Sequence, residues 1–218
     1  MPWDAVTPAG PVPKEAIRWL KAKGLKPSFS YRDTWKLEHE RAFSVAGVMR
    51  EDILKDIRDA LARALEEGQT FAAWKKGIAQ VLADKGWWGE QETEGEDGRK
   101  RTVKVTPHRL QLVYDTNMRT ARARGQWERI QRTKDVTPYL EYNLGPSERH
   151  RPHHAACEGT VLPVDDPFWS SGLPPNGFRC KCWVRALTES AGEAKGGVTA
   201  VPASPADEGW AFNPGTDP

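Results

Sequence analysis

Six side chains of the kinds that bind metal ions are concentrated in the C-terminal half of this 218-residue chain. They are three of its histidines and all three of its cysteines: His150, His153, His154, Cys157, Cys180 and Cys182. Imidazole nitrogens and thiolate sulfurs are the ligands that zinc prefers, and a metal stabilises a loop-rich segment that has little core. The pattern predicts one structural zinc ion held by His154, Cys180 and Cys182. Cys157 is the expected fourth ligand, with His150 as the alternative.

The same residues also have a plainer interpretation. Cys-x-Cys is rarer in zinc sites than Cys-x-x-Cys, which this sequence does not contain. A small buried cysteine pair beside exposed histidines fits the spacing better, so the prediction for cofactors is either none or one structural zinc. Three cysteines do not make a secreted disulfide framework, which favours synthesis in a reducing cytoplasm.

A catalytic alternative starts from the run RHRPHH at 149–154, which lies near the acidic residues Glu148, Asp165 and Asp166. A metal-dependent nuclease would use such a histidine as a base beside a metal. DNA hydrolysis needs the base and the metal ligands in one fixed geometry, and no second motif fixes them. Asp165-Asp166-Pro167 has the composition of a turn. We therefore expect no catalytic residues and no enzyme. The alternative function is a metal-dependent nuclease or a zinc-stabilised DNA-binding module.

The stretch 99–134 is rich in basic residues that could neutralise phosphates without reading a base sequence. The candidates for nucleic-acid binding are Arg119, Arg122, Arg129 and Arg132. The formal net charge of the chain is only +2, so a whole-chain electrostatic argument for DNA binding fails. An ordinary solvated helix face, paired with acidic residues elsewhere, explains the stretch equally well.

The elements that would carry these residues are mostly helical. Apolar residues recur at helical spacing over 14–23, 49–67, 71–85 and 107–132. Gly68 and Thr70 suit the end of one helix and the start of the next, which predicts an antiparallel helical hairpin. Asp33 or Thr34 could begin another helix that carries Trp35, Leu37 and Phe43. The polar segment 89–101 predicts a mobile loop or hairpin tip.

From Pro138 onward the helical periodicity ends, and prolines and glycines divide the chain into loops and short strands such as 160–164 and 181–187. We expect Phe168, Trp169, Phe178 and Trp183 to form a small core there.

The predicted fold class is α+β, with a predominantly helical body. The predicted parts are an extended N-terminal arm at 1–13, the helical body at 14–135, a Cys/His-containing loop-rich subdomain at 136–188 and a flexible tail at 189–218. The GWAFNPG end of the tail is expected to dock. No apolar run reaches the roughly 18–20 residues of a membrane span, and the N-terminus lacks the pattern of a signal peptide.

Three motifs between 139 and 187 carry a family resemblance. They are Arg-Pro-x-His-Ala at 151–155, Leu-Pro-x-Asp-Asp-Pro-Phe-Trp at 162–169 and Pro-Pro-Asn-Gly-aromatic-x-Cys-x-Cys at 174–182. Together they closely resemble the signature of the phage Mu F-like minor head proteins, a phage head morphogenesis family. Segments 38–47 and 112–130 and the GWAFNPG end are similar to this family too. More distant relatives have further cysteines and a histidine where this chain has Arg151, His154 and Gly177.

The resemblance implies a minor capsid protein of a tailed bacteriophage that acts in head morphogenesis near the portal. Its implied partners are the portal protein or the major capsid protein, together with packaged double-stranded DNA and the delivery of that DNA. The implied location is the virion, in the capsid interior or at the portal vertex, after synthesis in the host cytoplasm. No membrane is implied.

Overall fold

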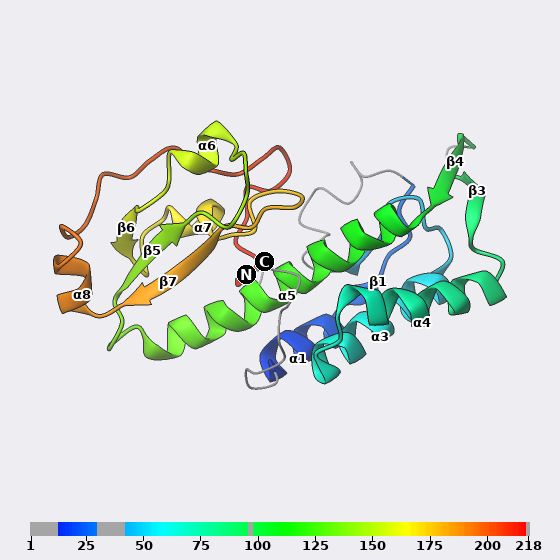
Figure 1. Cartoon of the computed structure of the whole chain (residues 1–218), viewed down its shortest axis with the longest axis horizontal. Helices are drawn as coiled ribbons and strands as arrows, with labels where there is room; N and C mark the ends of the chain where they lie inside the picture. Colours follow the sequence, from blue (N-terminus) through cyan, green and yellow to red (C-terminus); the bar gives the residue numbers. More distant parts are fainter. Residues whose placement is uncertain (1–12, 30–41, 96–97, 217–218) are drawn as a thin grey trace. The chain divides into compact units, whose positions relative to one another are not determined.

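The computed structural model describes residues 13–29, 42–95 and 98–216. The chain divides into two compact units, residues 1–121 (unit 1) and residues 122–217 (unit 2), as Figure 1 shows. The boundary falls inside helix α5 (Pro107–Thr133), which therefore contributes residues to both units. The four-part organisation predicted from the sequence is a different division, and its boundaries stay a prediction.

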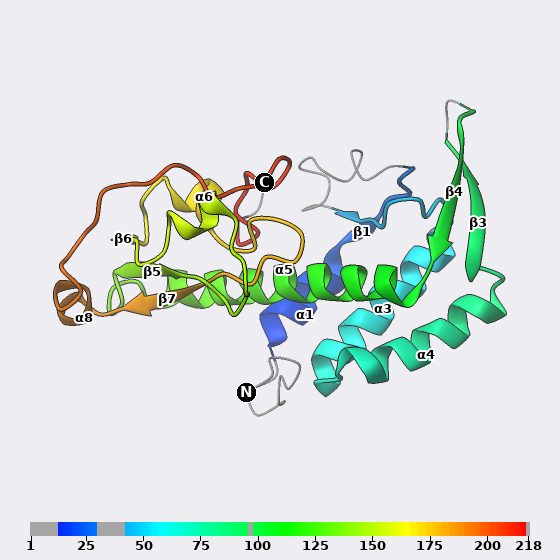
Figure 2. The same cartoon turned by 45° about the horizontal axis from the view of Figure 1, so that its top comes forward.

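Unit 1 contains helices α1 (Lys14–Ala22), α3 (Glu51–Glu67) and α4 (Phe71–Asp84). The predicted apolar stripe of α3 is buried: Ile53, Ile57, Leu61 and Leu65. Gly68 adopts a left-handed φ of 64° and ends this helix, and Thr70 begins the next by accepting a hydrogen bond from the Ala73 amide at 3.3 Å. The predicted hairpin of two helices is thus confirmed, and α3 and α4 lie side by side in Figure 2.

Phe43 lies in a strand and not in the predicted helix. Strand β1 (Gly24–Leu25) pairs in parallel with strand β2 (Ala42–Phe43), and the Phe43 ring is buried in the core of unit 1. The remaining residues of the predicted helix, 33–41, lie outside the described residues. The backbone of Ala42 and Phe43 finds its hydrogen-bond partners in Gly24 and Leu25, which are distant in sequence, so the local helical pattern did not predict the strand.

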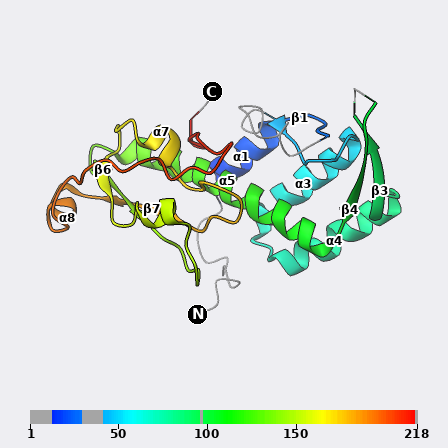
Figure 3. The same cartoon turned by 90° about the horizontal axis from the view of Figure 1, so that it is seen from above.

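The polar segment 89–101, predicted as a mobile loop or hairpin tip, forms most of a β-hairpin, which is seen clearly in Figure 3. Strand β3 (Gly89–Glu94) pairs antiparallel with strand β4 (Lys100–Val105) in continuous register. Glu90 lies opposite Lys104, and their side chains form an ion pair of 2.8 Å. The segment thus belongs to a hairpin, as one of the two predicted alternatives had it, but its paired strands were not predicted because each segment was considered alone. An acidic strand and a basic strand have little apolar content, yet pairing joins opposite charges, and Val103 and Val105 of β4 are buried.

Unit 2 is built on a three-stranded antiparallel sheet in the order β6-β5-β7. Strands β6 (Val161–Pro163) and β7 (Trp183–Leu187) fall where the sequence predicts strands, whereas the central strand β5 (Tyr139–Asn143) was not predicted. The core of the unit combines this sheet with Ile130 and with the aromatic pair Phe168 and Trp169. The predicted fold class, α+β with a helical body and a loop-rich C-terminal part, is confirmed.

Two of the four predicted core aromatics are not in this core. Trp183 is 40% exposed because it begins β7 on the strand's outward-facing positions, where Arg185 follows it. Phe178 is half-buried and packs at 5.1 Å, ring edge to ring face, on Trp210. The physical reason for Trp183 is strand alternation: Val184 and Ala186 take the positions that face the core.

The segment after β7 begins with a short helix, α8 (Glu189–Glu193), and then returns along unit 2 (Figure 1). Thr199 donates its backbone amide to the Val161 carbonyl at 2.9 Å. Trp210 and Asn213 are buried, and a side chain at Gly215 would collide with the ring of Trp127. The GWAFNPG end therefore lies against unit 2. Among the described residues no helix has the length and apolar character needed to cross a membrane.

Candidate metal centre

His154 lies on the short helix α6 (Pro152–Ala155), in unit 2. Pro152 occupies the first helical position, where its missing N–H leaves no hydrogen bond unmade. The His154 side chain is only 3% exposed, whereas the side chain of its neighbour His153 is 43% exposed. The helix therefore buries one of two adjacent imidazoles and leaves the other at the surface.

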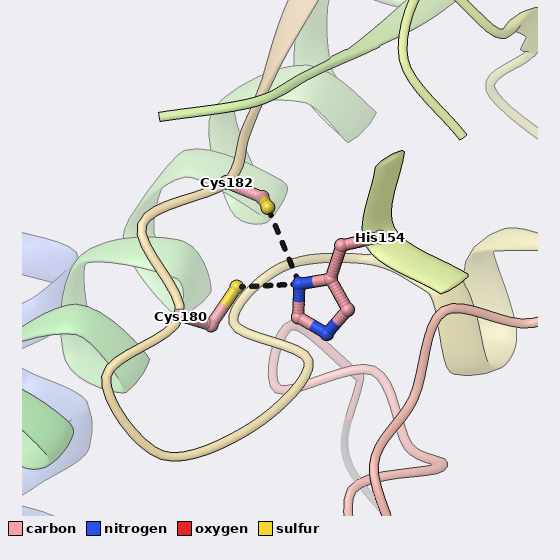
Figure 4. A group of neighbouring side chains, drawn as sticks. All are labelled: His154, Cys180 and Cys182. Carbon is pink, nitrogen blue, oxygen red and sulfur yellow. Dashed lines mark hydrogen bonds between the residues drawn. The ribbon is translucent and has the colours of Figure 1, made fainter. Parts of the chain in front are cut away.

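Cys180 and Cys182 approach His154 from the loop that leads into β7. The Cys180 amide donates to the Gly177 carbonyl at 3.1 Å, and Arg179 adopts a φ of 60° inside this tight turn. The Nδ1 atom of His154 lies 3.8 Å from the sulfur of Cys180 and 3.5 Å from that of Cys182, as Figure 4 shows. These three ligand atoms all lie within 4.8 Å of one another. The structure thus brings together the three residues predicted as the main zinc ligands.

The two thiols have opposite pKa shifts. Cys180 donates a hydrogen bond to Cys182, and this bond lowers the pKa of Cys182 below its ordinary value, with further help from His154 and Tyr142. The same bond, together with burial, raises the pKa of Cys180. Burial also raises the pKa of the Tyr142 hydroxyl, which therefore stays protonated and can donate. One thiolate is thus already favoured in this pocket.

Asp207 lies on the other side of the His154 ring and comes from the returning tail. Its carboxylate is 3.8 Å from Nε2 of His154, 2.9 Å from Nε2 of His153 and 3.5 Å from Nε of Arg151. Its backbone amide donates to the Asn176 carbonyl at 2.8 Å. A side chain at Gly177 would collide with the Asp207 carboxylate, so the aspartate is closely confined. Sequence reasoning missed this residue.

A zinc ion fits this set of residues. Nε2 of His154 is a buried nitrogen without a hydrogen-bond partner among the described residues. A metal on Nδ1 would place the ring proton on Nε2, facing Asp207, and a carboxylate partner of this kind orients many metal-binding histidines. Two thiolates and an imidazole are also the donor set that zinc prefers over harder cations. His154, Cys180 and Cys182 would hold the ion, which would cross-link α6 to the loop before β7.

Cys157 and His150, the two expected candidates for a fourth ligand, lie outside this three-residue group. The Cys157 sulfur lies 3.5 Å from the His153 carbonyl and 3.6 Å from the Ala203 carbonyl, and burial raises the pKa of its thiol to about 11. Nε2 of His150 lies 2.8 Å from the Gly145 carbonyl. Neither residue belongs to the group in the geometry shown, and the identity of a fourth ligand stays a prediction.

A second group of possible ligands, His153, His154 and Asp207, shares His154 with the first. It contains no sulfur, and His153 is largely exposed. The thiolate group is the better zinc site because its ligands are softer and Cys180 is only 2% exposed.

The residues considered for catalysis have structural contacts. Asp165 forms an ion pair with Lys134 at 2.9 Å, and Asp166 accepts the Phe168 amide at 2.8 Å in the turn after β6. The four arginines considered for nucleic-acid binding all lie on α5. Arg122, Arg129 and Arg132 are exposed, whereas Arg119 is half-buried and belongs to unit 1.

Comparison with known proteins agrees with the motifs of unit 2. The chain is 37% identical over 177 residues to the "Putative capsid assembly protein F" of Escherichia phage Mu, a match that covers 81% of this chain and 40% of that protein. It is 32% identical over 158 residues to the "Mu-like prophage FluMu F protein" of Haemophilus influenzae, covering 72% of this chain and 37% of that protein. The chain thus spans about two fifths of the length of these relatives. No solved structure shows a significant match.

The family comparison covers more than half of the chain. Residues 55–185 match the family described as "Phage Mu protein F like protein", a range that begins inside helix α3 and ends inside strand β7. The match contains His154, Cys180 and Cys182, while Asp207 lies beyond it. From the extent of this match and the identity to the Mu protein, the chain belongs to the phage Mu F-like protein family.

Proposed function

We propose that this chain acts in phage head morphogenesis as a minor capsid protein and has no enzymatic activity. The observation that carries the proposal is the 37% identity over 177 residues to a protein named for capsid assembly. The proposed location is the virion, in the capsid interior or at the portal vertex. The proposed partners are the portal protein and the major capsid protein.

The proposed metal centre has a structural role in this scheme. A zinc ion on His154, Cys180 and Cys182 would join segments that are 26 residues apart along the chain. Metal binding that occurs only in the folded state stabilises that state, and the loop-rich part of unit 2 has only a small sheet to hold it. The ion would thereby keep unit 2 in the shape that its partners bind.

Assembly assays test the capsid role directly. The full chain is expected to co-purify with the portal or major capsid protein of the same phage. Deletion of its gene should give defective heads or particles that fail to deliver DNA. Normal head formation and normal plaques from the deletion phage would contradict the proposal. The enzyme alternative predicts metal-dependent cleavage of plasmid DNA that is lost in His154→Ala, and cleavage of this kind would replace the structural role.

We also propose contact with packaged double-stranded DNA through Arg122, Arg129 and Arg132. The supporting observation is that all three are exposed on one helix, α5. Backbone contacts of this kind make affinity fall steeply with salt. The triple substitution to glutamine should weaken duplex binding and flatten its salt dependence, whereas Arg63→Gln, at an exposed site on α3, should not. Equal effects of both variants would contradict a defined DNA surface.

A further inference from the structure

A cavity of about 270 Å³ lies beside the cluster of His154, Cys180 and Cys182. All three residues line it, and the rest of its wall comes from the loop 145–151 and from Arg179 and Lys181. Gly145 permits the close approach of the two segments, because a side chain there would collide with the Lys181 carbonyl. The cavity thus has a buried floor of histidine and cysteine and a wall formed by two loops.

The cationic side chains of this wall outnumber its one anionic group, the thiolate that the lowered pKa of Cys182 favours. Arg149, Arg151, Arg179 and Lys181 line the cavity, and no aspartate or glutamate is among the lining residues, all of which belong to the described part of the chain. Arg149 and Lys181 are exposed, and neither forms an ion pair with a described residue. Asp207, which pairs with Arg151, is not a lining residue. The electrostatic preference of the cavity is therefore for an anion.

We infer that this cavity binds one phosphate group, with Arg149 and Lys181 as its main cationic contacts. A site of this charge suits a dianion with several acceptor oxygens better than a single carboxylate, because guanidinium and ammonium groups can donate to several of its oxygens at once. A volume of about 270 Å³ has room for a phosphate group between the two loops. Ser147, also in the wall, adds a neutral hydroxyl donor.

The phosphate could be free inorganic phosphate or the terminal phosphate of a nucleic acid. Both present the same oxygens to the cavity. This inference stands apart from the proposed capsid role, because it concerns a ligand of unit 2 and its test needs only the purified chain. A chain without head-assembly activity could still bind phosphate, and the reverse also holds.

The test is calorimetric titration of the full chain with inorganic phosphate at low ionic strength. We expect saturable binding at one site. Arg149→Gln and Lys181→Gln should each weaken binding by about tenfold, the usual effect of losing one hydrogen bond to a charged group. The matched controls are Arg63→Gln and Lys76→Gln, which remove the same charges from exposed sites on α3 and α4. The controls should leave the affinity unchanged.

Three results would overturn the inference. One is absence of saturable binding, and another is equal weakening in the cavity variants and their controls, which would mean diffuse attraction. The last is binding of acetate as tight as that of phosphate, which would identify a carboxylate site.

A 5′-phosphorylated dinucleotide then separates the two sources of the phosphate group. Tighter binding than inorganic phosphate assigns a nucleic-acid end, and weaker binding assigns the free anion. Far-ultraviolet circular dichroism of each variant verifies that it is folded.

Discussion

The carboxylate of Asp207 and the buried Nε2 atom of His154 lie 3.8 Å apart, on the side of the imidazole ring opposite the two cysteine sulfurs. The two nitrogens of this ring therefore have different neighbours. Nδ1 faces two metal-type ligands, and Nε2 faces an acceptor for its proton. This arrangement makes the metal centre testable residue by residue.

The first prediction concerns zinc content. The purified chain is expected to hold about one zinc per molecule, and Cys180→Ser, Cys182→Ser and His154→Ala should each lose most of it because zinc needs these thiolate and imidazole donors. Elemental analysis measures the content. His153→Ala is the control, since that histidine belongs only to the sulfur-free group. Zinc loss in the control but not in the cysteine variants would contradict the prediction, because it would place the ion on His153, His154 and Asp207.

The second prediction concerns Asp207 as a positioning residue. Asp207→Asn should weaken zinc binding by about 10–100-fold, because the carboxylate orients the His154 ring and strengthens it as a ligand. Competition against a chromophoric chelator measures the affinity. Glu208→Gln removes an equal charge from the exposed neighbouring position and should have no effect. If both variants bind zinc as tightly as the parent chain, Asp207 has no role in the site.

The third prediction separates Cys157 from the ligands. Cys157→Ser should keep its zinc, because the Cys157 sulfur contacts the carbonyls of His153 and Ala203 and lies outside the ligand group. A serine hydroxyl can donate to the same carbonyls, so we expect a stability loss of only about 1 kcal/mol. Elemental analysis measures the zinc content, and thermal unfolding measures the loss of stability. Zinc loss in a folded Cys157→Ser chain would restore the fourth ligand predicted from the sequence.

The fourth prediction concerns acid stability through Glu141, the side chain of which is 5% exposed and bonded to Arg185 at 3.0 Å and to Lys195. Burial alone would raise the pKa of Glu141, but the hydrogen bonds from Lys195 and Arg185 outweigh it and lower the pKa below its ordinary 4.5. The stabilising contribution is therefore complete above pH 4.5 and is lost as the pH falls through the lowered folded-state value.

Glu141→Gln should accordingly cost about 1–3 kcal/mol at neutral pH, since Arg185 and Lys195 are partly exposed and stay solvated. The difference between parent and variant should shrink in acid. Urea unfolding at a series of pH values measures it, with Glu193→Gln, an exposed acid on α8, as the control. A difference that stays constant down to low pH would contradict the assigned role of the carboxylate.

The sequence predicted local features well because the responsible residues are neighbours. The stripe of α3, the Gly68 cap and the Thr70 cap each depend on residues within a few positions. The paired strands of the β3–β4 hairpin were not predicted, because their stability depends on complementary charges, such as those of Glu90 and Lys104, which lie on different strands. Strand β5 gave no signal of its own because its three middle residues are all buried, so its sequence lacks the alternation of apolar and polar residues that marks a half-exposed strand.

The same distinction holds at the site. The unusual residue types and close spacing of His154, Cys180 and Cys182 were visible in the sequence. Only the loop before β7 has to fold back onto α6 to bring them together. Asp207 is 53 residues from His154 and is one of many aspartates and glutamates. The available signal was its position just before the aromatic residues Trp210 and Phe212, in a tail whose end was expected to dock.

The returning tail also sets an order of events during synthesis. A chain is made from its N-terminus, so His154 and both cysteines leave the ribosome before Asp207 does. The three ligands can therefore meet a metal ion while the carboxylate that orients the histidine is still absent. Metal capture would come first and the final ring orientation second, which makes the tail the last part of unit 2 to take its place.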